Sequence, residues 1–461
     1  MILFFDDQDL EGRKNFNRKY EAPEYLPQSY YRDPSDFGIG AGLPSVVYSD
    51  ELEEYVMIYN ILAPNDYPKL PLYLCAAHSK DLIHWEPLDT TKYMDIPNRA
   101  LFNQIFEKTN GEAWVYEDRR AEKAERYKMF FCGYGANCRM IDEIYVSPDL
   151  FHWTKLDSTW NRQGAEPGIC CLYSDKLKKY VITCRPHWGD RRVCYVTTED
   201  FRTFSPVTHC LQMDSMDEAT TDAYGLYAFE YDRYTIGLLW KYFRPNGIRS
   251  ITVGNQLINA LGRMYPELAY SFNGTNYMRS LRTPFIDNGS PEDPFYGCLF
   301  TSSMIKKDGK IYIISATLQC EHGGFRDKGS GAIVTHVIDE DRFIYLESEG
   351  YGDIITRNLL INGPLSVNAN VYSEMQCRLL DTDMNVVEGY DFEDFDKFKG
   401  NETNHVLTWH GKDTSVLKGK SLLLEISILG GRLYAIKGDF MILRFNQNRL
   451  YENYGIIEEE I

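Results

Sequence analysis

A short motif recurs four times along the 461-residue chain and limits its possible folds more than any other feature. It consists of a hydroxyl residue, an acid or amide two positions later, and an aromatic residue four positions after that. The copies begin at Ser79, Ser147, Thr198 and Ser271, about 50 to 75 residues apart, which is the scale of a propeller blade with variable loops. Since the hydroxyl and the carboxylate can cap a tight turn, we expect each copy to join two strands.

Each copy is preceded by two apolar segments with a turn between them, and a fifth such pair lacks the capped turn. In the fifth pair Asp308-Gly309 separates two apolar runs, which is a strong hairpin signal. The pattern predicts an all-β fold whose first part is a five-bladed β-propeller. The paired segments are residues 44–60, 113–135, 167–186, 224–243 and 298–319.

The pattern changes after about residue 356, where apolar residues alternate in strands separated by Asn, Gly and Asp. This part predicts a C-terminal β-sandwich in which Trp409 and Tyr434 belong to the core. We therefore expect two domains, a propeller over residues 1–355 and a sandwich over residues 356–461.

The charge and the cysteine content of the chain limit the kinds of partner and the location that we expect. Its formal net charge of −18 opposes binding to nucleic acid phosphates and to anionic membrane surfaces, so neither is an expected partner. The N-terminal segment is too short and too acidic for a signal peptide, and no apolar run is long enough to cross a membrane. The eleven cysteines are scattered, which indicates buried free thiols and a cytoplasmic location.

The repeats resemble those of the five-bladed propeller glycosidases, the grouping of glycoside hydrolase families 32, 43, 68 and 130. Residues 44–60 and the turns SKDLIHW and SPDLFHW carry the resemblance. A propeller followed by a β-sandwich is most similar to family 32, and the C-terminal segments resemble those of poorly characterised family-32-like bacterial proteins. The resemblance implies a glycosidase with its site in the propeller channel.

The catalytic motifs of those families match less closely. Families 32 and 43 place an aspartate directly before the first inner strand, whereas residues 40–44 read GAGLP here. Arg32-Asp33-Pro34 is similar to the Arg-Asp-Pro motif of family 32, but the family has that motif in a later blade, so its role is not transferred.

Glycoside cleavage needs two carboxyl groups, one to protonate the leaving oxygen and one to attack or to activate water. In a propeller, acids at the start of the inner strands converge on one end of the channel. We expect Glu166, which loosely resembles the Glu-Cys-Pro motif of family 32, to be the general acid. Asp36 is the expected nucleophile or base, with Asp33 as its rival, and Asp222 orients the sugar or tunes the acid. Further candidates for substrate contact at strand starts are Glu112 and Asp293.

Cationic and aromatic residues cluster in two loops that we also expect to contact substrate. The first contains Arg185, His187 and Trp188, and the second contains Glu321 and His322. Arg185 is suited to sugar hydroxyls or to a phosphate or carboxylate group, although pairing with a neighbouring acid explains it equally well. No cofactor or metal is expected, because the chain has no nucleotide-binding loop and no metal-ligand spacing.

The leading hypothesis is a glycoside hydrolase that cleaves a small, furanosidic oligosaccharide such as a fructoside or arabinoside. Two alternatives stay open. A glycoside phosphorylase would need a phosphate site, for which Arg185, His187 and Arg192 are candidates, and a non-catalytic carbohydrate-binding propeller would explain the missing aspartate. The sequence leaves open whether the chain forms a homo-oligomer.

Overall fold

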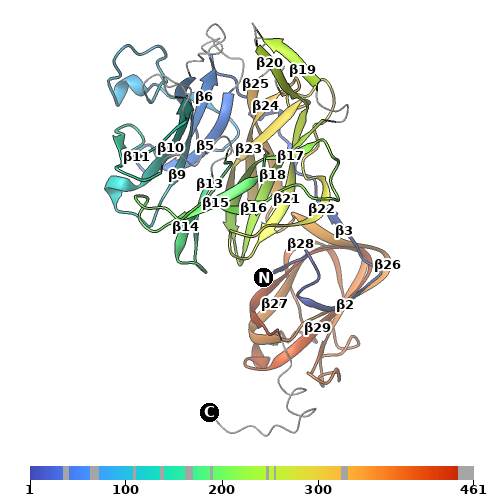
Figure 1. Cartoon of the computed structure of the whole chain (residues 1–461). Coiled ribbons are helices and arrows are strands. Elements are labelled where there is room, and N and C mark those ends of the chain that lie inside the picture. The colour runs from blue at the N-terminus through green and yellow to red at the C-terminus, as the bar shows by residue number, and fades with distance from the viewer. Residues whose placement is uncertain are drawn as a thin grey trace. The chain divides into compact units, whose positions relative to one another are not determined.

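The computed structural model describes residues 1–34, 41–62, 72–106, 111–134, 140–160, 170–186, 191–244, 249–253, 256–322 and 331–444. Its regular structure in these residues is β-strand apart from short 3-10 helices, which confirms the predicted all-β class (Figure 1). No helix in these residues is long and apolar enough to cross a membrane. The 3-10 helices are Pro27–Ser29, Thr90–Lys92, Lys123–Glu125 and Thr414–Leu417.

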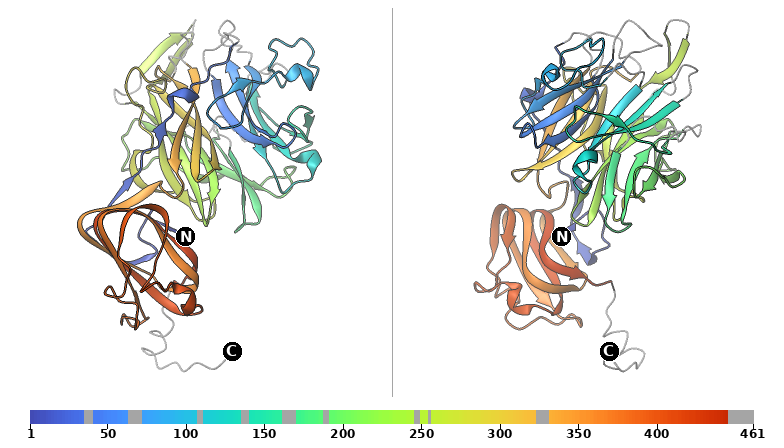
Figure 2. Two further views of the ribbon diagram at one scale, coloured as in Figure 1. Left: turned by 180° about the vertical axis from the view of Figure 1, so that it is seen from behind. Right: turned by 90° about the vertical axis from the view of Figure 1, so that its left-hand side faces the viewer.

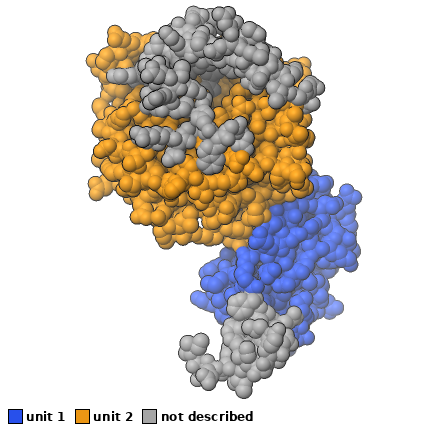
Figure 3. Space-filling model, viewed as in Figure 1, with its two compact units in different colours: residues 1–22, 338–461 blue, residues 23–337 orange. Residues whose placement is uncertain are grey.

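The chain forms two compact units, and their limits differ from the predicted division at residue 355 (Figure 3). Unit 1 contains residues 1–22 and 338–461, and unit 2 contains residues 23–337. The first 22 residues belong to unit 1 because their strands pair with strands of that unit. The strand β26 (Ile344–Thr356) also runs across the predicted boundary without a break.

Unit 1 is built on two strands of 22 residues each, β27 (Leu359–Leu380) and β29 (Ser421–Ile442). Both ends of β29 pair with Leu359, so the sheet bends back over itself and encloses a core (Figure 2). Trp409 and Tyr434 are buried, as predicted. The other strands are β1 (Ile2–Leu3), β2 (Leu10–Lys14), β3 (Asn17–Tyr20), β26 and β28 (Phe398–Val406).

Unit 2 consists of antiparallel groups of four strands, the arrangement of propeller blades. The first three groups are separate sheets. They contain β5 (Ala41–Ser49), β6 (Glu54–Leu62), β7 (Leu72–Ser79) and β8 (Glu86–Pro87); β9 (Gly111–Glu117), β10 (Tyr127–Tyr134), β11 (Met140–Ser147) and β12 (Thr154–Lys155); and β13 (Cys170–Ser174), β14 (Lys179–Cys184), β15 (Val193–Thr198) and β16 (Thr208–Leu211).

The remaining strands of unit 2 form an eight-stranded sheet and a separate hairpin. The large sheet has two antiparallel halves joined by one parallel pair, Met264 with Cys298. Its strands are β17 (Thr221–Tyr231), β18 (Tyr234–Phe243), β21 (Arg263–Ser271) and β22 (Met278–Pro284), then β23 (Cys298–Lys307), β24 (Lys310–Leu318), β25 (Gly331–Asp339) and β4 (Glu24–Tyr25). The hairpin is β19 (Arg249–Val253) with β20 (Gln256–Leu261).

The first strand of each group lies innermost. β5 contacts β9, β9 contacts β13, β13 contacts β17, β17 contacts β23, and β23 contacts β5, so the contacts run round a ring. Side chains tie neighbours together: Ser45 Oγ accepts a hydrogen bond from Val115 N, and Ser303 Oγ accepts one from Val46 N, both at 2.9 Å. The ring agrees with a propeller, and the number of five blades stays a prediction.

The four predicted turns are present with the same hydrogen bonds. In the first copy, Ser79 Oγ accepts from the backbone of Leu82 at 3.0 Å, and Asp81 Oδ1 accepts from the backbone of Ile83 and His84. The copies at Ser147, Thr198 and Ser271 repeat these bonds. The residue after the acid or amide has a positive φ in every copy, and the fourth copy has Gly274 there. The sequence prediction of capped turns is confirmed.

Acidification is expected to weaken these turns. Burial alone would raise the pKa of Asp149, but hydrogen bonds from His152 and from the backbone of Phe151 outweigh burial, so the pKa lies below its ordinary value of 3.8. A carboxyl group with a lower pKa in the folded state stabilises the fold above that ordinary value and loses its contribution as the pH falls below it.

We therefore expect Asp149→Asn to lower the free energy of unfolding by about 0.5–1.5 kcal/mol at neutral pH. The effect should be modest because Asn273 shows that an amide can form the same turn. Urea unfolding of both proteins across pH measures it, and the difference should shrink as the pH falls below 3.8 and the Asp149 carboxyl group becomes protonated. A difference that stays constant with pH would contradict this account of the turn.

Candidate functional site

Four of the predicted site residues lie outside the described residues, namely Asp36, Glu166, His187 and Trp188. Their predicted roles stay predictions. The other seven are described, and three of them, Asp222, Arg185 and His322, gather around the start of β17.

Asp222 is the second residue of β17, and two guanidinium groups approach its carboxylate. Arg244 Nη2 lies 2.8 Å from Asp222 Oδ2, and Arg191 Nη1 lies 3.3 Å from the same oxygen. The Asp222 side chain is 19% exposed, so it stays accessible to a ligand. The second carboxylate oxygen can accept hydrogen bonds from ligand hydroxyls.

Two tyrosines and a histidine extend this cluster. Tyr224 is the extra residue of a β-bulge between Ala223 and Gly225, a device that redirects a side chain. Its hydroxyl lies 2.9 Å from His322 Nε2, and its ring centre lies 5.7 Å from that of Tyr242. Burial raises the pKa of Tyr242, although Arg191 and Arg244 oppose the shift, so the phenol stays protonated at neutral pH.

Arg185 follows directly after β14 and is only 9% exposed. Its guanidinium carbon lies 4.6 Å from the ring centre of Tyr224, and its Nη1 donates a long hydrogen bond of 3.5 Å to the Tyr224 carbonyl. Among the residues that the structure describes, no carboxylate forms an ion pair with Arg185. The guanidinium can donate several hydrogen bonds to an anionic or hydroxyl-bearing group.

Gly262 has no side chain, which lets the loop that carries His322 pack beside Tyr242 and Arg244. His322 N donates a hydrogen bond of 2.9 Å to the Gly262 carbonyl, which brings the loop after β24 against β21. A Cβ atom at Gly262 would lie 2.7 Å from side-chain carbons of both Tyr242 and Arg244. Any larger residue would therefore displace two members of the cluster. Glu321 is half-buried beside His322.

The structure places the other predicted residues elsewhere. Asp33 is buried and accepts hydrogen bonds from Tyr59 and from Asn103 Nδ2. Asp293 Oδ2 accepts from both the backbone and the hydroxyl of Ser290, so it caps a turn. Glu112 is half-buried on β9 opposite Cys132. The hydrogen bonds explain Asp33 and Asp293 as structural groups, and the roles of all three acids in substrate binding stay predictions.

Sequence reasoning assigned no role to Tyr224, Tyr242 or Arg244. The one local signal for Tyr224 was its position two residues after Asp222. Tyr242 lies near the end of β18, which reads as a continuous core strand, and Arg244 follows that strand. Only the pairing of β18 with β17, which sets Asp222 opposite Tyr242, brings both residues to the site.

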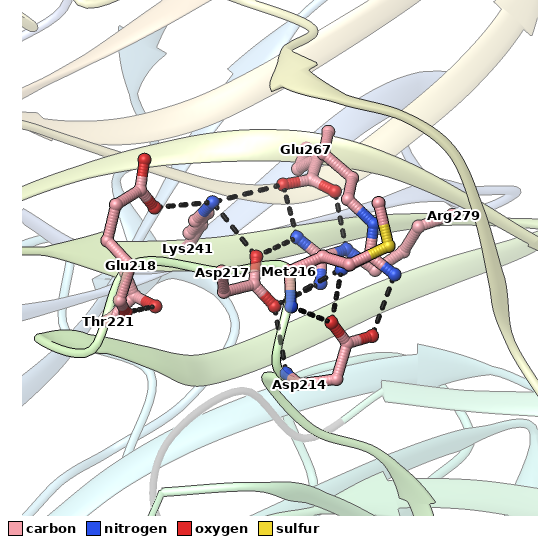
Figure 4. A network of polar contacts seen from close by, with 9 residues as sticks. Asp214, Met216, Asp217, Glu218, Thr221, Lys241, Glu267 and Arg279 are labelled. Atoms are coloured by element: carbon pink, nitrogen blue, oxygen red, sulfur yellow. Dashed lines mark hydrogen bonds and ion pairs between the residues drawn. The ribbon is translucent and has the colours of Figure 1, made fainter.

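A buried ionic network lies on the opposite face of β18, where Lys241 alternates with Tyr242 (Figure 4). Lys241 and Arg279 contact the carboxylates of Asp217 and Glu267, and the side chains of all four residues are at most 4% exposed. Arg279 reaches Asp217 at 2.7 Å. The network fastens the segment before β17 to β18 and β22, and thereby fixes the strand that carries Asp222.

The fold and the site define a β-propeller protein with a polar, aromatic cluster at the start of one inner strand and with a second all-β unit. Comparison with models of known protein families and with curated protein sequences finds no match.

Solved structures similar to the chain include glycoside hydrolases and a phosphorylase. A glycosyl hydrolase from Bacteroides ovatus is 12% identical over 70% of this chain and 95% of its own, with a TM-score of 0.47. Beta-1,2-mannobiose phosphorylase from Listeria innocua is 13% identical over 70% and 97%, with a TM-score of 0.45. A family-43 β-xylosidase/α-arabinofuranosidase from a compost metagenome is 11% identical over 70% and 95%, with a TM-score of 0.39. Similarity at this level does not establish the activity of the chain, and the resemblance to family 32 stays a prediction.

Proposed function

We propose that the chain is a glycoside hydrolase that cleaves a small, furanosidic oligosaccharide such as a fructoside or arabinoside. The observation that supports this most is the convergence of Asp222, Tyr224, Tyr242 and His322 at the start of β17. Asp222, Tyr224 and His322 are partly exposed and offer hydrogen-bond donors, acceptors and a ring face together, which is what a sugar ring with several hydroxyls requires, while the buried Tyr242 packs behind them.

The proposed chemistry uses paired carboxyl groups. Glu166 protonates the glycosidic oxygen as the bond breaks, and Asp36 either attacks the anomeric carbon or takes a proton from the attacking water. Asp222 accepts hydrogen bonds from sugar hydroxyls while Arg191 and Arg244 hold its carboxylate in place. Tyr242 is fully buried, and its ring packs against those of Tyr224 and His322.

A glycoside phosphorylase is the second candidate, and Arg185 is the observation that favours it. A buried guanidinium without an ion-paired carboxylate among the described residues suits a phosphate, which accepts paired hydrogen bonds from arginine. Under this proposal the phosphate replaces water as the attacking group, and the other residues keep their roles.

Replacing Arg185 separates the two candidates. For a hydrolase we expect cleavage without phosphate, and we expect Arg185→Met to lower kcat/KM by about 10- to 100-fold because one charge-assisted contact to the substrate is lost. Arg185→Lys, which keeps the charge, is the matched control and should lose less. Measuring initial rates at several phosphate concentrations gives the result. Cleavage that requires phosphate, with a raised KM for phosphate in Arg185→Met, would establish the phosphorylase instead.

A further inference from the structure

A cavity lies at the opposite end of the inner strands from Asp222. It has a volume of about 400 Å³, within the range of about 300–1,000 Å³ that ligand pockets occupy. The strands β5, β9, β13, β17 and β23 all contribute to its wall. Asp222 and Glu230 are eight residues apart on β17, and at about 3.3 Å per residue the two sites are separated by roughly 25 Å.

Aromatic residues line the wall of this cavity and recur at equivalent positions of the inner strands. Tyr48, Tyr116 and Tyr173 each occupy the second-last position of an inner strand, and Tyr227 and Phe229 lie near the end of β17. All five rings are only half-buried. Tyr116, Tyr173 and Tyr227 pack against the core on one side, and the exposed parts of the five rings can contact a ligand.

The polar groups of the cavity include both donors and acceptors. Arg119 Nε lies 2.9 Å from Glu117 Oε1, and both residues line the cavity. Glu230 lines it as well, and burial raises the pKa of its carboxyl group although the charge of Arg120 opposes the shift. The guanidinium supplies donors and the carboxylates supply acceptors, and a polyhydroxyl ligand uses donors, acceptors and ring faces at the same time.

We infer that this cavity is a second carbohydrate site that binds a neutral mono- or disaccharide. The sugar ring lies against Phe229 and the tyrosine rings, and its hydroxyls bond to Glu230 and Arg119. The inference does not depend on the proposed hydrolase activity, because the site uses the opposite ends of the inner strands and none of the residues around Asp222.

Binding of free sugars to the full-length protein tests the inference. Glucose, galactose, mannose, arabinose, fructose, sucrose and lactose are titrated by calorimetry, with saturation-transfer NMR for weak binders. At least one sugar should bind, and Phe229→Leu and Glu230→Gln should each weaken its binding at least 10-fold. Glu230→Gln changes an exposed side chain and keeps its size, so it tests the site even if the ring substitution disturbs folding.

Two further variants locate the binding. Asp222→Asn can weaken sugar binding only at the first site, so the binding that Phe229→Leu and Glu230→Gln weaken should persist in this variant. Tyr372→Ala, which removes a half-exposed ring in unit 1, should leave the affinity within twofold of the wild type. Binding that Asp222→Asn abolishes, binding that neither Phe229→Leu nor Glu230→Gln changes, or no binding of any of these sugars would overturn the inference.

Discussion

Replacing Glu267 by glutamine is expected to lower the free energy of unfolding of unit 2 by about 3–5 kcal/mol, the cost of breaking a buried ion pair on one side. Glu267 is fully buried, and its carboxylate bonds to Arg279 and lies 3.8 Å from Lys241 Nζ. The four buried charges balance in the wild type. Without Glu267, Asp217 is the one buried carboxylate of this network left to the two buried cations, although the exposed Glu218 lies 3.3 Å from Lys241 Nζ.

Urea unfolding followed by tryptophan fluorescence measures this change, because every tryptophan except Trp409 lies in unit 2. Asp214→Asn is the matched control. Asp214 belongs to the same network through Arg282, but its side chain is 45% exposed, so we expect a loss of at most about 1 kcal/mol. Equal and small losses in the two variants would show that the buried network contributes little to the stability of unit 2.

Replacing Glu166 by glutamine is expected to lower kcat on the cleaved glycoside by about 10²- to 10⁴-fold while binding of the substrate is kept. An amide of the same size cannot donate the proton that the leaving oxygen needs. Asp36→Asn should have a comparable effect, because an amide neither attacks the sugar nor accepts a proton from water.

Steady-state kinetics and calorimetric titration of the same substrate separate turnover from binding. Glu51→Gln, at an exposed turn between β5 and β6, is the matched control and should retain wild-type rates. If the wild type binds the sugar without turnover, and neither Glu166→Gln nor Asp36→Asn changes the affinity, the carbohydrate-binding propeller is the better explanation.

Local signals made the repeated turns predictable. Each of the turns at Ser79 and Ser147 depends on residues that lie within six positions of each other. The hairpin at Asp308-Gly309 depends on those two adjacent residues. The strands β2 and β3 could not be predicted, since their partner β26 lies more than 300 residues later in the chain. This long-range pairing is the reason that the predicted domain limits differ from the structural units.

The site was predictable only where a residue stood out in its own segment. Asp222 and Arg185 are polar residues at the ends of apolar strands, which marked them as candidates. Tyr242 lies in a strand that reads as core, and its role depends on strand pairing and on the bulge at Tyr224. Asp33 is the opposite case, because a local signal was present but the structure gives the residue other contacts. Arg32-Asp33-Pro34 resembles a motif of family 32, whereas the buried Asp33 carboxylate accepts hydrogen bonds from Tyr59 and Asn103.

Cleavage of short fructosides, arabinosides, galactosides and mannosides by the wild-type protein, with and without phosphate, tests the central claim most directly. We predict release of a monosaccharide from a fructoside or arabinoside at a rate independent of phosphate, lost in Glu166→Gln. Failure to cleave any of these glycosides under either condition, by a folded protein that binds them, would contradict the proposal that this propeller is an enzyme.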